Sequence, residues 1–278
     1  MQNRSDKIAR YDKALFFFTA SLIIPWIFFF LAAYLSKLPE AKNLAFLQGI
    51  LSLIGLIAPC IVAFYIFASK GVKFKDFKDR FSLKGVDKNY LFLSVFMTFA
   101  ALILAQFISL LFGHGLEQFY ISGKTSFESA LFNPWFILAF AAIAEELAWH
   151  TYGTDALRAK FSLFVSSVIF AFYWAIWHLP LSFIDGYYHS EVAVSGSLYV
   201  VNFIVSLFVF VILMNWLYFK TGRNVTIAIL FHLFANLTNE IFATHPDSKV
   251  IQTAILLVVC VIVLIREKEL FFSSNLKF

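Results

Sequence analysis

The chain has 278 residues, of which 61% are apolar and 19% aromatic, while only 14% are charged. Soluble domains carry roughly a quarter charged residues, so this composition, with a mean hydropathy of +0.80, excludes an ordinary soluble protein. Apolar runs of about 20 residues are long enough to cross a bilayer as helices. We therefore predict an all-α polytopic membrane protein in which residues 1–278 form a single membrane domain.

Eight apolar segments are candidate membrane spans. Basic loops remain in the cytoplasm, and 18 of the 22 lysines and arginines lie on the terminal segments and the even-numbered loops. Both termini are therefore predicted to be cytoplasmic. The net charge of +5 then reports orientation in the lipid bilayer, and no nucleic-acid partner is predicted. The spans are expected at 14–35, 44–69, 90–113, 134–152, 161–183, 199–219, 225–243 and 250–265.

The longest charged loop covers residues 70–89. Phe74, Phe77 and Phe81 recur among its charges at spacings of three and four residues. This pattern is typical of a short helix that lies at the headgroup level of a membrane. The loop is therefore predicted to form an interfacial helix.

Three spans carry polar side chains that are costly in lipid. A carboxylate at the centre of a membrane helix costs about 2.5 to 3.5 kcal/mol, so such residues face an interior or a cavity and mark functional sites. The fourth span supplies two glutamates and a histidine, the fifth a histidine, and the seventh a histidine and an asparagine. These candidates are Glu145, Glu146, His150, His178, His232 and Asn236.

The spacing of these residues divides them between two helix faces. Glu146 and His150 are four residues apart and share a face, whereas Glu145 lies about 100° around the helix. Two adjacent carboxylates in an apolar interior do not both ionise cheaply. We expect one to act as a working carboxylate and the other to be neutral or held structurally by hydrogen bonds.

Local signals predict where the helices that carry these residues begin and end. Asn133 and Pro134 form an N-cap and first-turn pair for the fourth span, and Gly153 is expected to end it. The segment after Gly153 is predicted to run along the membrane surface, so that the fifth span begins near Ser167. Pro180 lacks a backbone donor and is expected to distort the helix beside His178.

At these positions the chain resembles the CAAX-processing and bacteriocin-processing family of intramembrane proteases (CPBP, also called Abi), which includes the Ras-converting CAAX endopeptidase. The family carries the motifs EExxxR, FxxxH and HxxxN or HxxxD on separate membrane helices. This chain has EELAWH at 145–150, WAIWH at 174–178 and HLFAN at 232–236. The resemblance spans about residues 134–243. Two positions differ, because His150 replaces the arginine and Trp174 replaces the phenylalanine.

The resemblance implies a role for each site residue. Glu145 would be the general base that activates water, and His178 would hold the same water. His232 and Asn236 would stabilise the oxyanion, as acyl transfer requires. Glu146, His150 and Trp174 would support the site. The implied function is an intramembrane endopeptidase that acts on a membrane-associated peptide or protein.

Whether a metal takes part is open in the sequence. Glu145, His178 and His232 form a set of two histidines and one glutamate, which is a ligand type of catalytic zinc sites. The family is often labelled as metalloprotease. The chain has no HExxH helix, and the resemblance also implies a metal-free mechanism, which we favour slightly.

Two other classes of function compete with a protease. The first is a catalytically inactive bacteriocin-immunity or scaffold protein of the same fold, which His150 in the arginine position favours. The second is a proton-coupled transporter that uses the glutamates as a relay, which the absence of a visible inverted repeat of broken helices disfavours. The brief loops favour a prokaryotic cell membrane. His114, His189 and His245 are predicted in outer loops without a role.

Overall fold

The computed structural model describes residues 10–273 and confirms the all-α prediction, since these residues form no named strand. Short 3₁₀ segments are η1 (Ala41–Leu44), η2 (Phe74–Asp76), η3 (Lys78–Phe81), η4 (Leu116–Phe119) and η6 (Leu179–Phe183). One π-helical turn is η5 (Trp149–Gly153). The α-helices are α2 (Ala14–Ser36), α3 (Ala45–Ser69), α4 (Lys88–Leu110), α5 (Pro134–Ala148), α6 (Thr154–Arg158), α7 (Leu163–His178), α8 (Tyr188–Ser195), α9 (Ser197–Lys220), α10 (Val225–Ile241), α11 (Pro246–Arg266) and α12 (Lys268–Phe272).

Six helical segments in the described range are long and apolar enough to cross a membrane. The helix α10 is apolar but shorter, and α5 is 15 residues long before its π turn. The predicted count of eight spans therefore stays a prediction. The six segments are Ala14–Ser36, Ala41–Ser69, Lys88–Leu110, Leu163–Phe183, Ser197–Lys220 and Pro246–Arg266.

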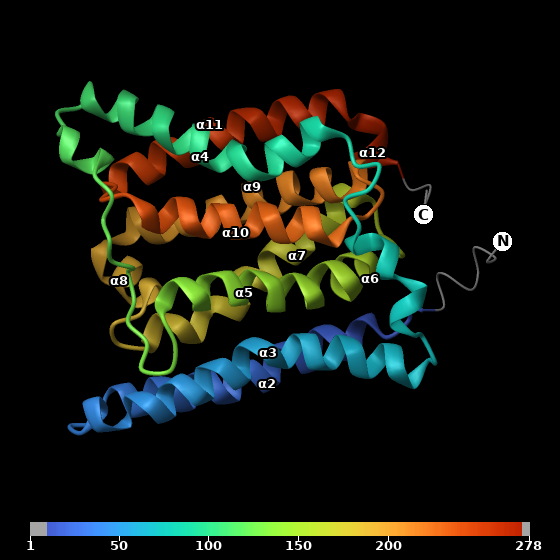
Figure 1. The fold of residues 1–278 in the computed structure, drawn as a ribbon, viewed down its shortest axis with the longest axis horizontal. Helices are drawn as coiled ribbons and strands as arrows, with labels where there is room; N and C mark the ends of the chain where they lie inside the picture. The colour runs from blue at the N-terminus through green and yellow to red at the C-terminus, as the bar shows by residue number, and fades with distance from the viewer. Residues whose placement is uncertain (1–9, 274–278) are drawn as a thin grey trace.

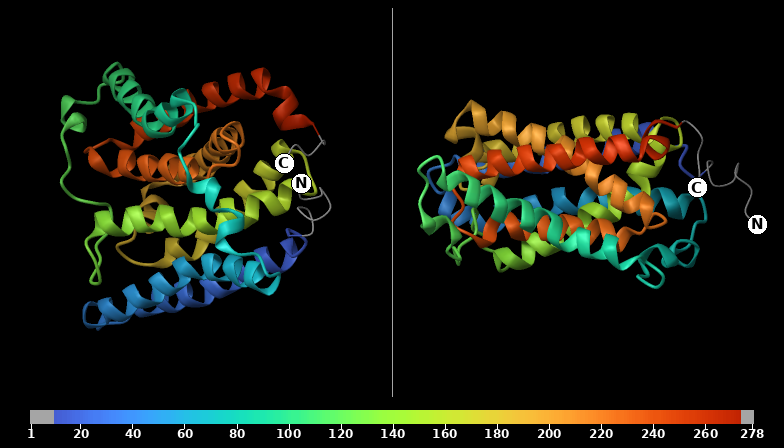
Figure 2. Two further views of the ribbon diagram at one scale, coloured as in Figure 1. Left: turned by 45° about the vertical axis from the view of Figure 1, so that its right-hand side comes forward. Right: turned by 90° about the horizontal axis from the view of Figure 1, so that it is seen from above.

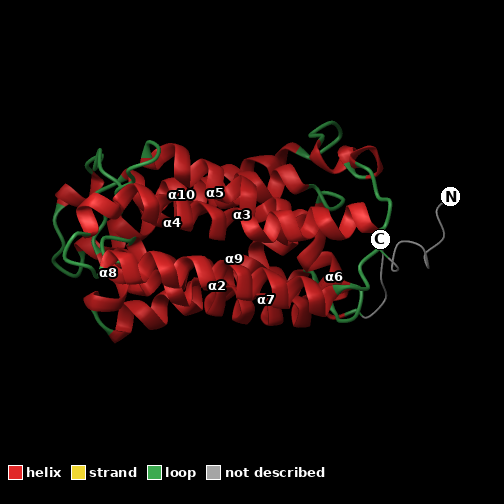
Figure 3. Cartoon of the chain, turned by 90° about the horizontal axis from the view of Figure 1, so that it is seen from below, coloured by secondary structure: helices red, strands yellow, loops and turns green. Residues whose placement is uncertain are grey.

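The helices lie side by side in a bundle whose centre holds the polar residues. In Figure 1 the α2–α3 pair forms one edge, α4 and α11 form the other, and α5, α7, α9 and α10 lie between them. Seen from below and coloured by secondary structure, the loops gather at the two ends (Figure 3). The start of α2 and the end of α12 share one end, and α8 lies at the other (Figures 1 and 2).

The first turn of α5 is formed as predicted, but its predicted end is wrong. The Asn133 side chain accepts a hydrogen bond from the Trp135 backbone N–H at 2.9 Å, with Pro134 next in the chain. Gly153 does not end the helix, because its φ of −56° is helical and the chain continues through η5 into α6. A Cβ there would lie 3.0 Å from the buried ring of Phe17. The glycine permits close helix packing and is not a C-terminal cap.

The helix α7 begins earlier than predicted, because Ser162 caps it by accepting from Val165 N–H at 3.3 Å. Ser167 is fully buried inside the helix, so the predicted surface segment is wrong. With both corrections, Glu145 and His178 lie at similar depths from the end of the bundle that contains the start of α2. Glu145 lies 13 residues from Arg158 and His178 lies 15 residues from Leu163, or about 20 and 22 Å at 1.5 Å per residue.

The expected distortion at Pro180 is a change of helix type. The α-helix ends at His178, and the 3₁₀ helix η6 follows with Pro180 near its start. The 70–89 loop contains two short 3₁₀ helices in place of a single interfacial helix. Phe77 is buried there and stacks on Phe67 with ring centroids 5.4 Å apart, which ties the loop to the end of α3.

A buried ionic cluster closes the end of the bundle that contains the start of α2. Asp155 of α6 accepts hydrogen bonds from Arg223 and from Tyr218, the latter at 3.1 Å, and forms an ion pair with Arg80 at 3.0 Å. Burial raises the pKa of Asp155, but Arg223 and Arg80 outweigh burial and the net pKa is lowered. The cluster joins the 70–89 loop to α6 and to the α9–α10 connection.

Candidate active site

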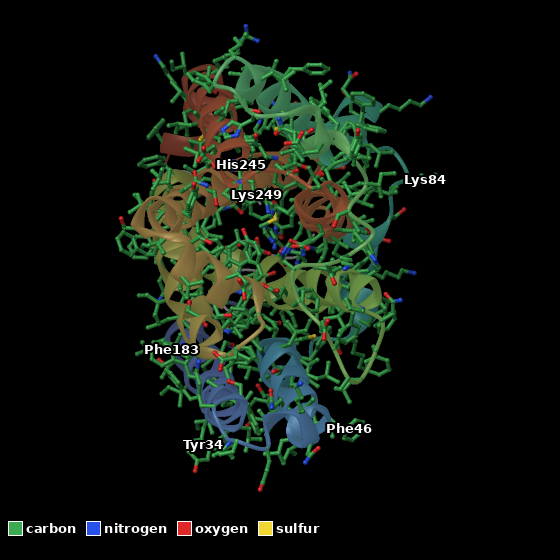
Figure 4. All side chains as sticks on the ribbon, turned by 90° about the vertical axis from the view of Figure 1, so that its left-hand side faces the viewer. Tyr34, Phe46, Lys84, Phe183, His245 and Lys249 are labelled. Atoms are coloured by element: carbon green, nitrogen blue, oxygen red, sulfur yellow. The ribbon has the colours of Figure 1, made fainter. Side chains whose placement is uncertain are left out.

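A cavity of about 1070 Å³ reaches from the α8 end of the bundle to the polar residues at its centre. Its walls come mainly from α3, α5, α7, α8, α9, α10 and α11, and from the loop segments 126–132 and 184–187. Figure 4 looks onto this end, where Lys249 lies toward the middle and Tyr34 and Phe46 lie at the periphery. The cavity therefore opens opposite the ionic cluster.

Glu145 lines this cavity with one carboxylate oxygen held in place. Its Oε2 accepts hydrogen bonds from the indole N–H groups of Trp149 at 3.2 Å and Trp174 at 3.0 Å. Its side chain is nearly buried, with 6% of the residue exposed. No residue within 10–273 is recorded as a partner of Oε1, which leaves this oxygen available to a molecule in the cavity.

Glu146 faces away from the cavity and joins two histidines. Its Oε1 lies 2.7 Å from His232 Nδ1, and its Oε2 contacts His150 Nδ1. The residue is fully buried and is not part of the cavity wall. The two adjacent glutamates therefore serve two faces, as the helical spacing predicted.

His150, in the position of the family's arginine, is hydrogen-bonded through both ring nitrogens. Its Nε2 lies 3.0 Å from Oδ1 of Asn215, while Nδ1 contacts the Glu146 carboxylate. Asn215 is fixed in turn by donating to Ser167 at 2.8 Å. The Glu146 carboxylate and Asn215 Oδ1, which face the two ring nitrogens, are both hydrogen-bond acceptors. His150 is thus held behind Glu146 at the position where the family has an arginine.

His178 and His232 present their remaining ring nitrogens beside the cavity. His178 Nδ1 lies 2.7 Å from the carbonyl oxygen of Trp174, a contact that requires Nδ1 to carry the hydrogen and leaves Nε2 as an acceptor. The Trp174 ring stands edge-on to both histidines, with centroid distances of 5.1 and 5.5 Å. Trp174 therefore positions Glu145 through its N–H and contacts both histidines through its ring, and a phenylalanine would supply only the ring.

Asn236 lies one turn beyond His232 on α10 and lines the same cavity. Its side-chain amide has no recorded hydrogen-bond partner within residues 10–273, so its donors are free to meet a ligand. The structure thus brings all seven predicted site residues together. Glu145, Trp174, His178, His232 and Asn236 lie on the cavity wall, and Glu146 and His150 lie behind it.

His189 is a cavity residue that the sequence reasoning missed. It was predicted in an outer loop without a role, but α8 folds over the cavity and the His189 ring stacks on His178 at 4.9 Å. No spacing pattern could have revealed this contact, because the two histidines lie on different helices and the loop between them determines how the helices approach. Asn215 was also missed, although an asparagine inside an apolar span was a visible signal.

Comparison with known proteins identifies the family to which these residues belong. The model for Rce1-like type II CAAX prenyl endopeptidases matches residues 127–238. The curated protein "CAAX prenyl protease 2" of Methanococcus maripaludis is 32% identical over 268 residues, which covers 95% of this chain and 97% of that protein. The chain belongs to the Rce1-like CAAX prenyl endopeptidase family.

Family membership supports an intramembrane endopeptidase, and together with the six apolar helices it indicates an integral, multi-pass membrane protein. The matched segment contains all seven site residues predicted from the sequence. In the chain described here, the arginine of EExxxR is absent. His150, held between Glu146 and Asn215, stands in its place.

Metal ligation by Glu145, His178 and His232 can be tested against their spacing. A zinc ion about 2.0 to 2.2 Å from each ligand requires ligand atoms about 3.3 to 3.6 Å apart. Within the described residues, the recorded group whose ligand atoms all lie within 4.8 Å is His114, His245 and Asp247, at the α8 end of the bundle. As arranged here, the Glu145 set does not form a ready metal site.

Proposed function

We propose that this protein hydrolyses a peptide bond of a membrane-associated peptide or protein with a water molecule activated by Glu145. The observation that carries the proposal is Oε1 of Glu145 on the cavity wall, beside His178 and His232, which has no hydrogen-bond partner among residues 10–273, while Oε2 is held by two indoles. A general base needs a free lone pair and a fixed orientation, and this carboxylate has both.

In the proposed reaction, Glu145 Oε1 takes a proton from a water that also donates a hydrogen bond to His178 Nε2. The resulting hydroxide attacks the carbonyl carbon, and the electron pair of the C=O bond moves to oxygen. Asn236 Nδ2–H and, when its ring is protonated, His232 Nε2–H donate to this oxyanion. Protonated Glu145 then delivers its proton to the leaving amine as the C–N bond breaks.

Glu146 and His150 act in this scheme by positioning. Glu146 holds Nδ1 of His232 and stabilises the doubly protonated ring that an oxyanion donor requires. His150 gives Glu146 a second hydrogen-bonding partner, without which this buried carboxylate would contact His232 alone. The substitution of the family's arginine is therefore compatible with activity, and this reading disfavours an inactive scaffold.

We also propose that the reaction needs no tightly bound metal, because the ligand atoms of Glu145, His178 and His232 are not arranged as a metal site. The measurement is peptide hydrolysis by the purified protein before and after dialysis against a chelator. Activity should be retained. A loss that only added zinc restores would overturn the metal-free proposal and leave the protease intact.

The substrate class is proposed from the relative and from the shape of the site. The curated relative is named a CAAX prenyl protease, and many residues on the cavity wall are apolar or aromatic, which suits a lipidated peptide. The cavity opens at the end opposite α12. If the basic end faces the cytoplasm, as the charges predict, substrates reach the site from the other face of a prokaryotic membrane.

The decisive test compares Glu145→Gln with the parent in liposomes that contain a lipidated peptide near the membrane surface. Glu145→Gln should lower the rate of cleavage by at least about 100-fold, because it removes a general base. The matched control is Glu128→Gln, an exposed carboxylate on the same cavity wall, which should cleave like the parent. Cleavage by Glu145→Gln at the parental rate would refute the mechanism, and proton flux without cleavage would favour a transporter.

A further inference from the structure

A lysine on the cavity wall forms no ion pair with any acidic side chain of residues 10–273. Lys249 of α11 lines the cavity, donates to the backbone carbonyl of Asn239 at 3.2 Å, and lies 5.3 Å from the ring centroid of Tyr188. No ion pair of Lys249 is recorded among the described residues. A half-buried ammonium whose direct contacts are a carbonyl oxygen and a ring is a site for an anion.

The neighbouring carboxylate is already engaged. Glu240 follows Asn239 on α10 and is buried, but its two oxygens accept from the backbone N–H and the hydroxyl of Ser126 at 2.6 and 2.7 Å. Both Glu240 oxygens are therefore engaged by Ser126, and no hydrogen bond joins Glu240 to Lys249 within residues 10–273. The other cavity lysine, Lys42, is exposed in η1, just before α3. Lys249 is therefore the more enclosed cation of the two.

The distance from His232 to Lys249 can be estimated along α10, because Asn239 of this helix contacts the Lys249 ammonium. Asn239, which binds the ammonium, follows His232 by seven residues, or about 10.5 Å at 1.5 Å per residue. Three extended residues span about 10 to 11 Å at 3.3 to 3.6 Å each. A peptide whose scissile carbonyl lies at His232 would thus place the end of its third following residue at Lys249, whereas two residues would fall short.

We propose that Lys249 binds the free C-terminal carboxylate of the substrate, three residues beyond the scissile bond. This inference rests on the proposed protease function and adds the group that binds the C-terminus of the substrate. The length agrees with the CAAX sequence in the relative's name, in which three residues follow the cysteine. The ammonium sets the register of the peptide, so that the carbonyl of the correct residue faces Glu145.

The experiment uses the full chain in liposomes and two farnesylated peptides whose cysteine is followed by three aliphatic residues. One peptide ends in a carboxylate and the other in a carboxamide, and mass spectrometry measures the released fragments. The parent should cleave the carboxylate peptide with a kcat/KM about 10- to 100-fold higher, the range of a hydrogen bond to a charged group. Lys249→Met should lower cleavage of the carboxylate peptide to the carboxamide level and leave carboxamide cleavage unchanged.

Controls separate this proposal from the function on which it rests. Lys42→Met should keep the parental preference, and Lys249→Arg, which keeps the charge, should retain part of it. If Lys249→Met cleaves neither peptide, loss of the preference in Lys249→Arg overturns the proposal and retention supports it. Equal cleavage of both peptides by the parent overturns the role of Lys249 but leaves the protease assignment intact. Cleavage of neither by the parent overturns the protease assignment itself.

Discussion

Glu146→Gln is the substitution that most directly tests the positioning network behind the cavity. The carboxylate of Glu146 accepts from His232 through Oε1 and contacts His150 through Oε2. A glutamine has nearly the same shape but only one acceptor oxygen, and its NH₂ group would meet the N–H of the other histidine. One charge-assisted hydrogen bond is lost and the doubly protonated form of His232 is less stable.

The size of the effect follows from that lost bond. A hydrogen bond to a charged group is worth about 1.5 to 3 kcal/mol, which corresponds to about 10- to 150-fold in kcat if it acts only in the transition state. KM should change little, because Glu146 is not on the cavity wall. Glu145→Gln should be more severe, since it removes the base itself.

Initial rates of peptide cleavage in liposomes, fitted for kcat and KM, provide the assay. Glu128→Gln controls for the loss of a carboxylate on the cavity wall, and thermal unfolding in detergent controls for folding. A Glu146→Gln protein that is folded and has a kcat within twofold of the parent would refute the positioning role. A rise in KM at constant kcat would instead assign Glu146 to substrate binding.

Three further predictions concern His150, the buried ionic cluster at Asp155 and the helix packing at Gly153. His150→Arg restores the family's residue and should keep kcat within about tenfold of the parent, because arginine also donates to Glu146. The same cleavage assay measures kcat. A complete loss of cleavage would show that the imidazole itself is required. Asp155→Asn should destabilise the protein by about 3 to 5 kcal/mol, because it leaves two partly buried arginines without their anion. The pKa of Asp155 is lowered on folding, so its stabilisation is complete at neutral pH and is lost as the pH falls below about 4; thermal unfolding of both proteins from pH 3 to 7 should show the difference shrinking at acid pH, and a constant difference would contradict this. Gly153→Val should cost about 1 to 3 kcal/mol through overpacking against Phe17, visible as a lower Tm at unchanged pH dependence, and an unchanged Tm would mean that the ring can move aside.

Local chemistry in the sequence determined the fold class and most of the helix starts. Long apolar runs can satisfy backbone hydrogen bonds in a bilayer only as helices, so an all-α protein followed from composition. Asn133 and Asn224 each accept a hydrogen bond from the first turn of the next helix, which a capping residue does through its nearest neighbours. The four-residue spacing of Glu146 and His150 likewise placed both on one face, because helix periodicity is local.

Contacts between distant segments were decided only by the tertiary structure. Gly153 was expected to end a helix, but the ring of Phe17, 136 positions earlier in the chain, determines that a glycine is needed there for packing. His189 and Lys249 reach the cavity because α8 and α11 fold against α7 and α10. Sequence spacing contains no information about such approaches, since packing between helices depends on the shapes of both surfaces. The sequence therefore identified which residues are costly in a membrane, and the fold decided which of them face one another across the cavity.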